Sequence, residues 1–390
     1  MLHLRVLASC ATALLFCAAT LALVYGHAPA LGLIDHPDGR KKHLGHIPLI
    51  GGIAVFTGVL CGACVAGQAD MLTCVILGTT AILALTGVLD DRFELGVLTR
   101  LLVQAAAVLT VIGFTGLHIH TLGRVFGVEL ELGVLGIPLT LLAVIGLLNA
   151  FNMMDGIDGL AGMLAITSTG AIVYFLGLSM WSSIGLLLLL SAALLPYLAA
   201  NLGLVGRKVF LGDAGSVVLG YLLAWTLIRL SQQAHPQLST VDVLWCVALP
   251  VLDTLAVMIR RLGEHRSPFK PDRGHIHHLL LDAGIGPGIS LALLIGLAIV
   301  FVCFGAQTSR LNPGSNLLAF GALSVIYIAA HGGIYRRQRT RRVTASTGIA
   351  HVVGTVGLIL PRARALKARP GYPLKPRTAA TSRRPPAPLL

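Results

Sequence analysis

The sequence predicts an all-α polytopic membrane protein, because three of its properties do not fit a soluble domain. Hydrophobic residues make up 55% of the 390 residues and charged residues only 12%, whereas about a quarter of the residues in soluble proteins are charged. The mean hydropathy is +0.84. The apolar residues also gather in runs close to the roughly 20 residues that cross a bilayer. We therefore expect about eleven transmembrane helices.

The expected helices cover residues 5–26, 47–66, 71–89, 101–117, 135–151, 160–178, 181–199, 214–230, 241–259, 289–306 and 315–331. The first run follows Arg5 and precedes the small-residue segment HAPA, so a cleaved signal peptide is an alternative for it. The seven cysteines fall inside the runs, where a thiol is by default a small buried side chain. The pair in CGAC, at Cys61 and Cys64, leaves a redox or metal site as a weak alternative.

Basic residues set the expected orientation, because they accumulate in cytoplasmic loops. They concentrate in the odd-numbered connections and after the last run, in GRKKH, DDRFELGVLTR, GRK, RRLGEHRSPFKPDRGHIHH and RRQRTRR. The even-numbered connections hold few basic residues. The N terminus is thus expected on the outer side of the membrane and the C terminus on the cytoplasmic side. Most acidic residues lie in the same odd connections, so the active-site loops are expected on the cytoplasmic face.

Two further segments are assigned from their patterns. Residues 123–138, GRVFGVELELGVLGIP, alternate in a way that indicates a short periplasmic β-hairpin. Residues 1–334 are expected to form an integral membrane catalytic domain. Residues 335–390 are expected to be a basic, Pro/Ala-rich cytoplasmic tail, disordered at its end, that seeks the membrane surface and not nucleic acid.

Asp90 and Asp91 end the third run, in LTGVLDDRFELG. Adjacent carboxylates repel each other unless a cation or a proton lies between them. A metal ion, a basic partner or proton transfer is therefore indicated. The alternative is a solvated helix end paired with Arg92.

Asn152, Asp155 and Asp158 follow the fifth run in NAFNMMDGIDGLAG. Gly156 and Gly159 allow a tight backbone that turns these side chains toward a common centre. Oxygen ligands of this kind suit Mg²⁺, which usually takes one or two carboxylates with phosphate and water. The spacing does not fit a calcium loop.

Asp213 stands in KVFLGDAGS, directly before the eighth run. Its flanking glycines let a phosphate approach the backbone near a helix N terminus, whose free amides favour anions. The alternative is a simple helix N-cap.

The ninth connection holds the histidine motif, in which His275, His277 and His278 stand close to Arg273. This set suits charged hydrogen bonds to a phosphate-bearing, sugar-bearing substrate. A zinc site is the alternative there.

Five motifs thus follow one another: RKKHLGHIPLIGG, LDDRFE, NAFNMMDGIDGLAG, KVFLGDAGS and SPFKPDRGHIHH. In this order, on one predicted membrane face, they resemble the polyprenyl-phosphate N-acetylhexosamine-1-phosphate transferases of glycosyltransferase family 4. The match runs from about residue 35 to residue 284. The resemblance implies transfer of N-acetylglucosamine-1-phosphate from UDP-N-acetylglucosamine to undecaprenyl phosphate, with release of UMP. It also implies Mg²⁺, for which Mn²⁺ can substitute, and a place at the first membrane step of a cell-surface polysaccharide pathway.

The resemblance also implies roles for the residues. It places the metal on Asn152 and Asp213. Asp90 and Asp91 would orient the lipid phosphate or take its proton, with Arg100 as a cationic partner. Because the second pKa of a phosphate is about 6, a true general base is not required.

The remaining assignments concern the other loops. Asp155 and Asp158 match family positions important for activity. Donor binding falls to Arg273, His275, His277 and His278, and a basic rim to Lys41, Lys42 and His43.

The form SPFKPDRGHIHH favours a small amino sugar over UDP-N-acetylmuramoyl-pentapeptide, the donor of a more distant branch. UDP-N-acetylgalactosamine or a modified hexosamine remains an alternative donor. The expected partners are undecaprenyl phosphate, the UDP-sugar and the membrane, with a homodimer as an option and no nucleic acid.

Two other classes of function are alternatives, a transporter and a scaffold. A secondary transporter would need acidic residues in the middle of its spans. Only Asp253 stands at such a position, and it is expected to be a buried hydrogen-bond partner. A scaffold would not explain acids gathered on one face.

Overall fold

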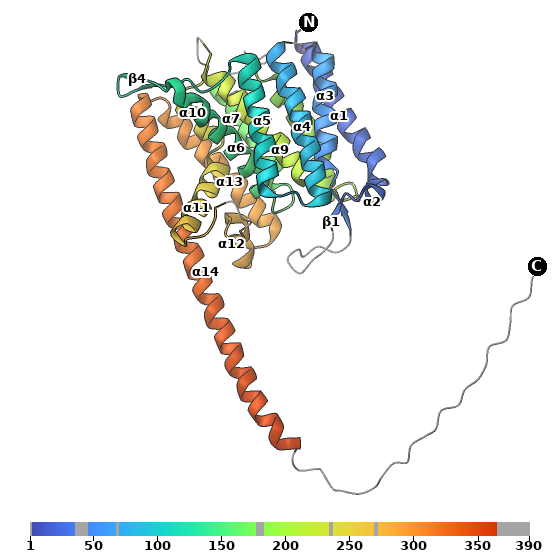
Figure 1. Cartoon of the computed structure of the whole chain (residues 1–390), viewed down its shortest axis with the longest axis vertical. Coiled ribbons are helices and arrows are strands. Elements are labelled where there is room, and N and C mark those ends of the chain that lie inside the picture. Colours follow the sequence, from blue (N-terminus) through green and yellow to red (C-terminus); the bar gives the residue numbers. More distant parts are fainter. Residues whose placement is uncertain are drawn as a thin grey trace, which may run out of the picture. The chain divides into compact units, whose positions relative to one another are not determined.

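The computed structural model describes residues 2–35, 46–67, 70–176, 183–233, 237–268 and 272–364 (Figure 1). Residues 1–338 form one compact unit and residues 339–390 a second. The helices are α1 (Leu2–Tyr25), α2 (Ala28–Leu31), α3 (Gly51–Ala66), α4 (Met71–Phe93), α5 (Val97–Thr115), η1 (Gly133–Leu135), α6 (Gly136–Met154), α7 (Leu160–Leu176), α8 (Gly185–Asn201), α9 (Gly212–Ser231), α10 (Thr240–Cys246), α11 (Ala248–Gly263), α12 (Ile276–Asp282), α13 (Pro287–Thr308) and α14 (Pro313–Arg364). The strands are β1 (Ile34–Asp35), β2 (Ile47–Pro48), β3 (Thr121–Val125) and β4 (Val128–Glu131).

Each of the eleven expected runs contains helix. Among the described residues, seven helices are long and apolar enough to cross a membrane, the last of them as Pro313–Thr340 of α14. Three more, α3, α7 and α8, are apolar but shorter. These features are those of an integral membrane protein, and the count of eleven spans stays a prediction.

The ninth run is not one straight helix. It breaks between α10 and α11, whose axes differ by 85°. Pro250 has no amide hydrogen, so it cannot donate to the carbonyl four residues earlier, and this removes one bond that would continue α10 into α11. Counting apolar residues alone did not predict this break.

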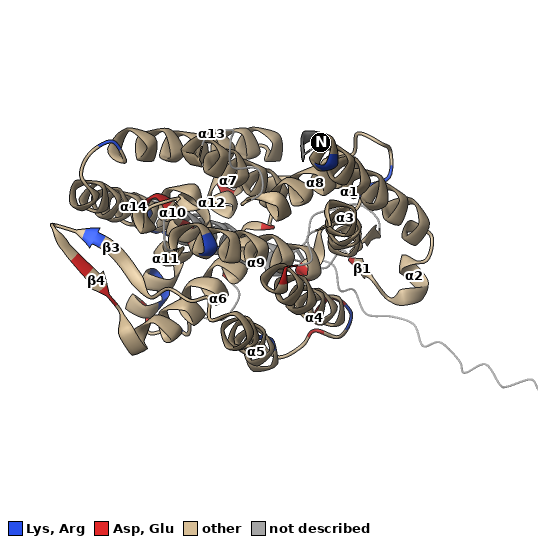
Figure 2. Ribbon diagram, turned by 90° about the horizontal axis from the view of Figure 1, so that it is seen from above, with Lys and Arg blue, Asp and Glu red and all other residues tan. Residues whose placement is uncertain are grey.

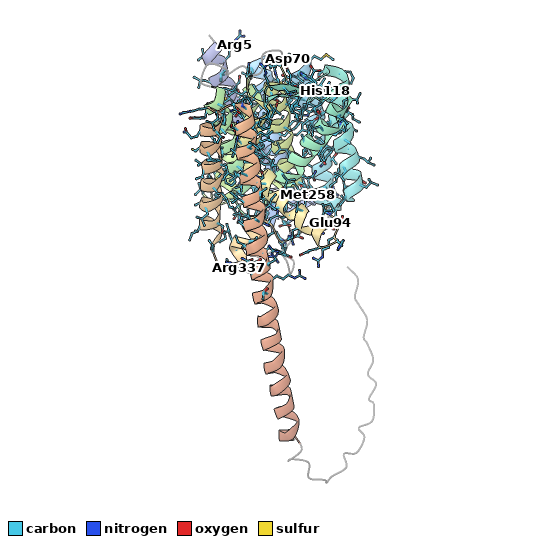
Figure 3. All side chains as sticks on the ribbon, turned by 90° about the vertical axis from the view of Figure 1, so that its left-hand side faces the viewer. Arg5, Asp70, Glu94, His118, Met258 and Arg337 are labelled. Atoms are coloured by element: carbon cyan, nitrogen blue, oxygen red, sulfur yellow. The ribbon has the colours of Figure 1, made fainter. Side chains whose placement is uncertain are left out.

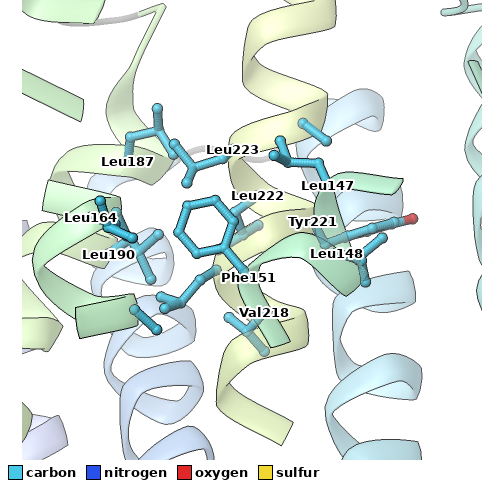
Figure 4. Packing of buried hydrophobic residues seen from close by; sticks show 14 of the residues in the cluster. Leu147, Leu148, Phe151, Leu164, Leu187, Leu190, Val218, Tyr221, Leu222 and Leu223 are labelled. Carbon is cyan, nitrogen blue, oxygen red and sulfur yellow. The ribbon is translucent and has the colours of Figure 1, made fainter. Parts of the chain in front are cut away.

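Helix α9 forms the centre of the first unit and is almost entirely buried. It packs against α3, α4 and α6, and Figure 2 shows these helices around it. Glycines permit the close approach: a Cβ on Gly52 would overlap Gly215, and one on Gly87 would overlap Ala214. Small residues at helix crossings are typical of membrane bundles. On the α6 side Phe151 fills the space between α7, α8 and α9 (Figure 4).

The predicted hairpin is present, with β3 and β4 paired antiparallel. Its two-residue turn is Phe126–Gly127, and both residues have positive φ, as the tight turn of a hairpin requires. At the C terminus, helix α14 continues to Arg364. The first part of the expected tail is therefore helical, which its composition did not indicate. Residues 365–390 lie outside the described part.

Candidate functional site

The acidic residues singled out from the sequence lie at one end of the helices in the first unit. Asp90 and Asp91 are in the last turn of α4, Asn152 is near the end of α6, and Asp213 is in the first turn of α9. Because α9 runs antiparallel to α4 and α6, these ends coincide. Figure 3 labels Glu94, which directly follows α4, toward this end, with Arg5, Asp70 and His118 at the opposite end.

Asp91 binds the N terminus of α9. Its Oδ1 accepts the backbone N–H of Asp213 at 2.9 Å, and its Oδ2 lies 3.5 Å from the amide nitrogen of Ala214. A carboxylate is favourable there because the first amides of a helix have no partner within it. Asp213 is therefore not the N-cap of α9. Its own side chain is left to face the other helix ends.

Asp90 is held by a basic partner. It is only 7% exposed, and its Oδ2 accepts from Nη1 of Arg100 at 2.6 Å while its Oδ1 accepts from the amide of Leu95 at 2.7 Å. Arg92 instead stacks on the ring of Phe93. The alternative of a solvated helix end paired with Arg92 is therefore wrong. Arg100 is the basic partner of Asp90, while Asp91 accepts backbone amides of α9.

Asn152 and Asp213, the two residues proposed to hold the metal, are in direct contact. Asn152 Nδ2 donates to Asp213 Oδ1 at 2.7 Å and to Ser216 Oγ at 3.0 Å. Nη1 of Arg100 lies 3.5 Å from Asp213 Oδ2. The polar residues lining the pocket between α4, α5, α6 and α9 are Thr86, Asp90, Arg100, Gln104, Asn149, Asn152 and Asp213.

The charges of this pocket suit a divalent cation. Asp90 and Asp213 contribute two carboxylates to its lining and Arg100 one guanidinium, which leaves one formal negative charge, and Asp91 adds a further carboxylate beside it at the N terminus of α9. In the described residues no three His, Cys, Asp or Glu side chains could hold a metal together. Mg²⁺ usually takes few protein ligands and completes its shell with phosphate and water. A flip of the Asn152 amide would present its oxygen to such an ion.

The turn after α6 carries the next two acids. Asp158 Oδ2 accepts from Lys208 Nζ at 2.6 Å. Asn201, at the end of α8, accepts the amide of Gly159 at 2.6 Å and donates to the carbonyl of Val209 at 2.8 Å. These contacts attach the DGIDG turn to the segment KVFLG that leads into α9.

The histidine motif lies against the same turn. A Cβ on Gly156 would overlap the imidazole of His277, so the turn and α12 are in close contact. Burial lowers the pKa of His277 to about 3 and that of His278 to about 4. Both rings are thus neutral at pH 7. Arg273 is exposed at the start of the motif and supplies positive charge beside His278.

The first motif reaches the site through its C-terminal half. Phe210 accepts the amide of Gly51 at 2.9 Å, and Leu211 accepts that of Gly52 at 2.8 Å. The start of α3 is thereby hydrogen-bonded to the segment that leads into α9. The expected basic rim, Lys41, Lys42 and His43, lies outside the described residues.

The sequence reasoning did not assign Lys208 or Asn201. Lys208 was counted only as a loop cation that indicates orientation, although it belongs to KVFLGDAGS. Asn201 ends an apolar run, as Asn149 and Asn152 do, and that signal could have identified it. The partners of these residues lie 50 and 42 positions away, so only the fold identifies them.

Asp155 gives the site a pH dependence that can be measured without turnover. Burial, then the charges of Asp213 and Asp158, raise the pKa of this carboxyl from 3.8 to about 7. The folded protein therefore binds the proton more tightly than the unfolded chain, so the stabilisation is complete below pH ~4 and is lost as pH rises through about 7. In detergent with a chelator, the Tm of the wild type should fall between pH 4 and 8 relative to that of Asp155→Asn. Parallel curves for the two proteins would contradict this.

Comparison with known proteins gives the family. The model of a family described as glycosyl transferase family 4 matches residues 73–231. A Yersinia pestis protein named undecaprenyl-phosphate alpha-N-acetylglucosaminyl 1-phosphate transferase is 41% identical over 303 residues, which cover 76% of this chain and 83% of the relative. Proteins of the same name from Escherichia coli K12 and Haemophilus influenzae are 40% and 35% identical, covering 73% and 79% of this chain and 80% and 89% of the relatives. The chain therefore belongs to glycosyl transferase family 4, as its five motifs predicted.

Proposed function

We propose that this protein transfers N-acetylglucosamine-1-phosphate from UDP-N-acetylglucosamine to undecaprenyl phosphate. The products are undecaprenyl-diphospho-N-acetylglucosamine and UMP. The observation that carries the proposal is that polar side chains of three helix ends, Asp90, Asn152 and Asp213, from motifs far apart in the chain, meet in one pocket at a single end of an apolar helix bundle. The relatives that bear this activity in their names, and that this chain covers over about four fifths of their length, support the choice of substrates.

The reaction forms one bond and breaks one. An oxygen of the lipid phosphate attacks the donor phosphorus that bears the sugar, and the bond from this phosphorus to the bridging oxygen breaks, so that UMP leaves with that oxygen. Such a transfer asks the protein mainly for alignment and for neutralisation of charge. A pocket at the end of the helices suits this, because the polyprenyl tail can stay in hydrocarbon while its phosphate reaches the polar groups.

The residues divide into three groups by their contacts. Asn152 and Asp213 would hold Mg²⁺, which when bound would neutralise charge on the donor diphosphate. Arg100 has the position to bind the acceptor phosphate, since its guanidinium spans Asp90 and Asp213. Each oxygen of Asp90 already accepts one hydrogen bond, Oδ2 from Arg100 and Oδ1 from the amide of Leu95. Asp90 therefore orients Arg100 and does not act as a general base.

The histidine motif is proposed to bind the sugar end of the donor. His277 and His278 are neutral and pack against each other, with ring centroids 4.1 Å apart. Neutral imidazoles donate and accept hydrogen bonds to sugar hydroxyls and the acetamido group, while Arg273 supplies charge for phosphate. We place the site on the cytoplasmic face of a bacterial inner membrane, where the UDP-sugar is found, with the N terminus outside and the C terminus inside.

The proposal predicts that UMP release needs both substrates and the metal. The purified protein in detergent is incubated with UDP-N-acetylglucosamine, with and without undecaprenyl phosphate, Mg²⁺ and excess chelator, and UMP is quantified by chromatography. Release should require lipid phosphate and Mg²⁺, and added Mg²⁺ should restore it after chelation. UDP-N-acetylgalactosamine should react more slowly. Equal or faster release from that donor would overturn the assignment of the sugar, and no release from either donor would overturn the transferase.

A further inference from the structure

A buried acid outside the pocket contacts the histidine motif. Asp253, in α11, is fully buried. Its Oδ2 lies 2.7 Å from His275 Nδ1, and its Oδ1 accepts the backbone N–H of Ile276 at 2.9 Å. One carboxylate thus binds both the ring of His275 and the first amide of α12. Burying a carboxylate is costly unless it is paired and hydrogen-bonded, so these contacts explain why it can stay at this position.

We propose that Asp253 is a positioning residue, which orients His275 for the sugar-phosphate end of the donor. A carboxylate only accepts hydrogen bonds, so His275 must carry its proton on Nδ1 and leave Nε2 for the substrate. A fixed tautomer and ring orientation is what a carboxylate provides to histidines at other functional sites. This inference rests on the proposed function, in which His275 binds the donor.

The carboxylate is itself held by the last helix of the unit. The hydroxyl of Tyr327 donates to Asp253 Oδ1 at 3.3 Å, and His331 Nε2 lies 3.6 Å from the same oxygen. Both residues belong to α14. The resemblance gave this helix no role, and the matched family region ends at residue 231. Tyr327 and His331 thus contact Oδ1, whereas His275 is bound by the other oxygen of the carboxylate, Oδ2.

Other contacts fix the same part of the molecule. Arg260 of α11 bonds to Asp272 at 2.6 Å and stacks on the ring of Tyr335, 3.9 Å from its centroid. The Gln338 side chain donates to the carbonyl of Leu279 at 2.8 Å. Helices α11, α12 and α14 thus stay together by contacts that do not involve Asp253. A variant at Asp253 can therefore lose the orientation of His275 while the surrounding helices remain folded.

The test is a double-mutant cycle between Asp253 and His275 in the full-length protein. Asp253→Asn has the same shape but can present an N–H to the ring. Donor binding is measured by titration calorimetry with UDP-N-acetylglucosamine and Mg²⁺, and UMP release by kcat and KM for each substrate. We expect Asp253→Asn to lower donor affinity and the donor kcat/KM by about 10- to 100-fold, with the KM for undecaprenyl phosphate unchanged. In a His275→Gln background the same change should have almost no further effect.

Tyr327→Phe is the matched control, because it removes a hydrogen bond from the same carboxylate without touching His275. It should keep the wild-type donor affinity, whereas a purely structural role for Asp253 would give Tyr327→Phe and Asp253→Asn similar losses. The inference is overturned if Asp253→Asn acts equally with and without His275, if both substrates lose affinity together, or if Asp253→Asn binds the donor like the wild type. A wild-type protein that neither binds the donor nor releases UMP would instead overturn the proposed function.

Discussion

Replacing Asp213 by asparagine is expected to lower kcat for UMP release by about 10²- to 10³-fold, the cost typical of removing one preorganised electrostatic group from an active site. Asp213 Oδ1 lies 2.7 Å from Asn152 Nδ2, and its Oδ2 lies 3.5 Å from Arg100 Nη1. The same carboxylate therefore serves the proposed metal site and balances the charge of Arg100. Its backbone amide is bound by Asp91. The substitution keeps that amide bond and the shape of the side chain, and it removes only the charge.

The control for this variant is Asp70→Asn, at the other end of the same helix bundle (Figure 3). Asp70 accepts the amide of Thr73 as the N-cap of α4, which asparagine also does well. The Asp70→Asn variant should therefore keep the wild-type kcat. The Asp213 variant should also need more Mg²⁺ for half-maximal rate, which a folding defect would not produce. An unchanged kcat and an unchanged Mg²⁺ requirement in Asp213→Asn would remove this residue from the proposed metal site.

The sequence was sufficient to predict that the polar groups at the ends of α4, α6 and α9 gather at one end of the bundle, although it missed Lys208 and Asn201. Asp90, Asn152 and Asp213 each follow or precede an apolar run, and hydrocarbon excludes such groups, so their depth in the membrane follows from physical chemistry. All three residues lie in odd-numbered connections, so the sequence also predicted that they share one face of the membrane. This reasoning needs only the order of apolar and polar segments along the chain.

The pairing of those residues could not be predicted in the same way. Asp91 binds an amide 122 residues further on, and Asp253 binds a histidine 22 residues further on that belongs to another element. Which partner each acid meets depends on how the helices pack around α9, and the glycines at Gly52 and Gly87 decide how closely they do so. Spacing within one motif holds no information on these contacts.

The bend between α10 and α11 is a similar case. An apolar run of suitable length does not show whether it is straight, and the effect of Pro250 depends on whether neighbouring helices accept the bend. In the structure the bend lets α11 carry Asp253 to the histidine motif. The position of His275 therefore depends on a feature that hydropathy does not report.

A methyl group on Gly156 is expected to reduce activity by about 10²-fold, because it would separate the DGIDG turn from the histidine motif. The Cβ of Gly156→Ala would overlap the imidazole of His277, which is buried and cannot swing into solvent. Overpacking of this kind costs about 1–3 kcal/mol, so the Tm should also fall. A displacement of about 1 Å between groups that bind one substrate can by itself cost about 10²-fold in rate. UMP release and thermal unfolding in detergent measure the two effects.

Two further variants separate this clash from a general intolerance of added bulk. Gly170→Ala, in α7, places its Cβ in open space and should keep the wild-type rate and Tm. His277→Ala removes the imidazole that the new methyl group would overlap, so Gly156→Ala should destabilise the His277→Ala protein far less than the wild type. Activity should stay low in that double variant, since the proposed donor ligand is gone. Equal losses of Tm from Gly156→Ala in the wild type and in the His277→Ala protein would mean that the DGIDG turn and the histidine motif are not in contact. The histidines would then not lie beside the acidic residues of the site.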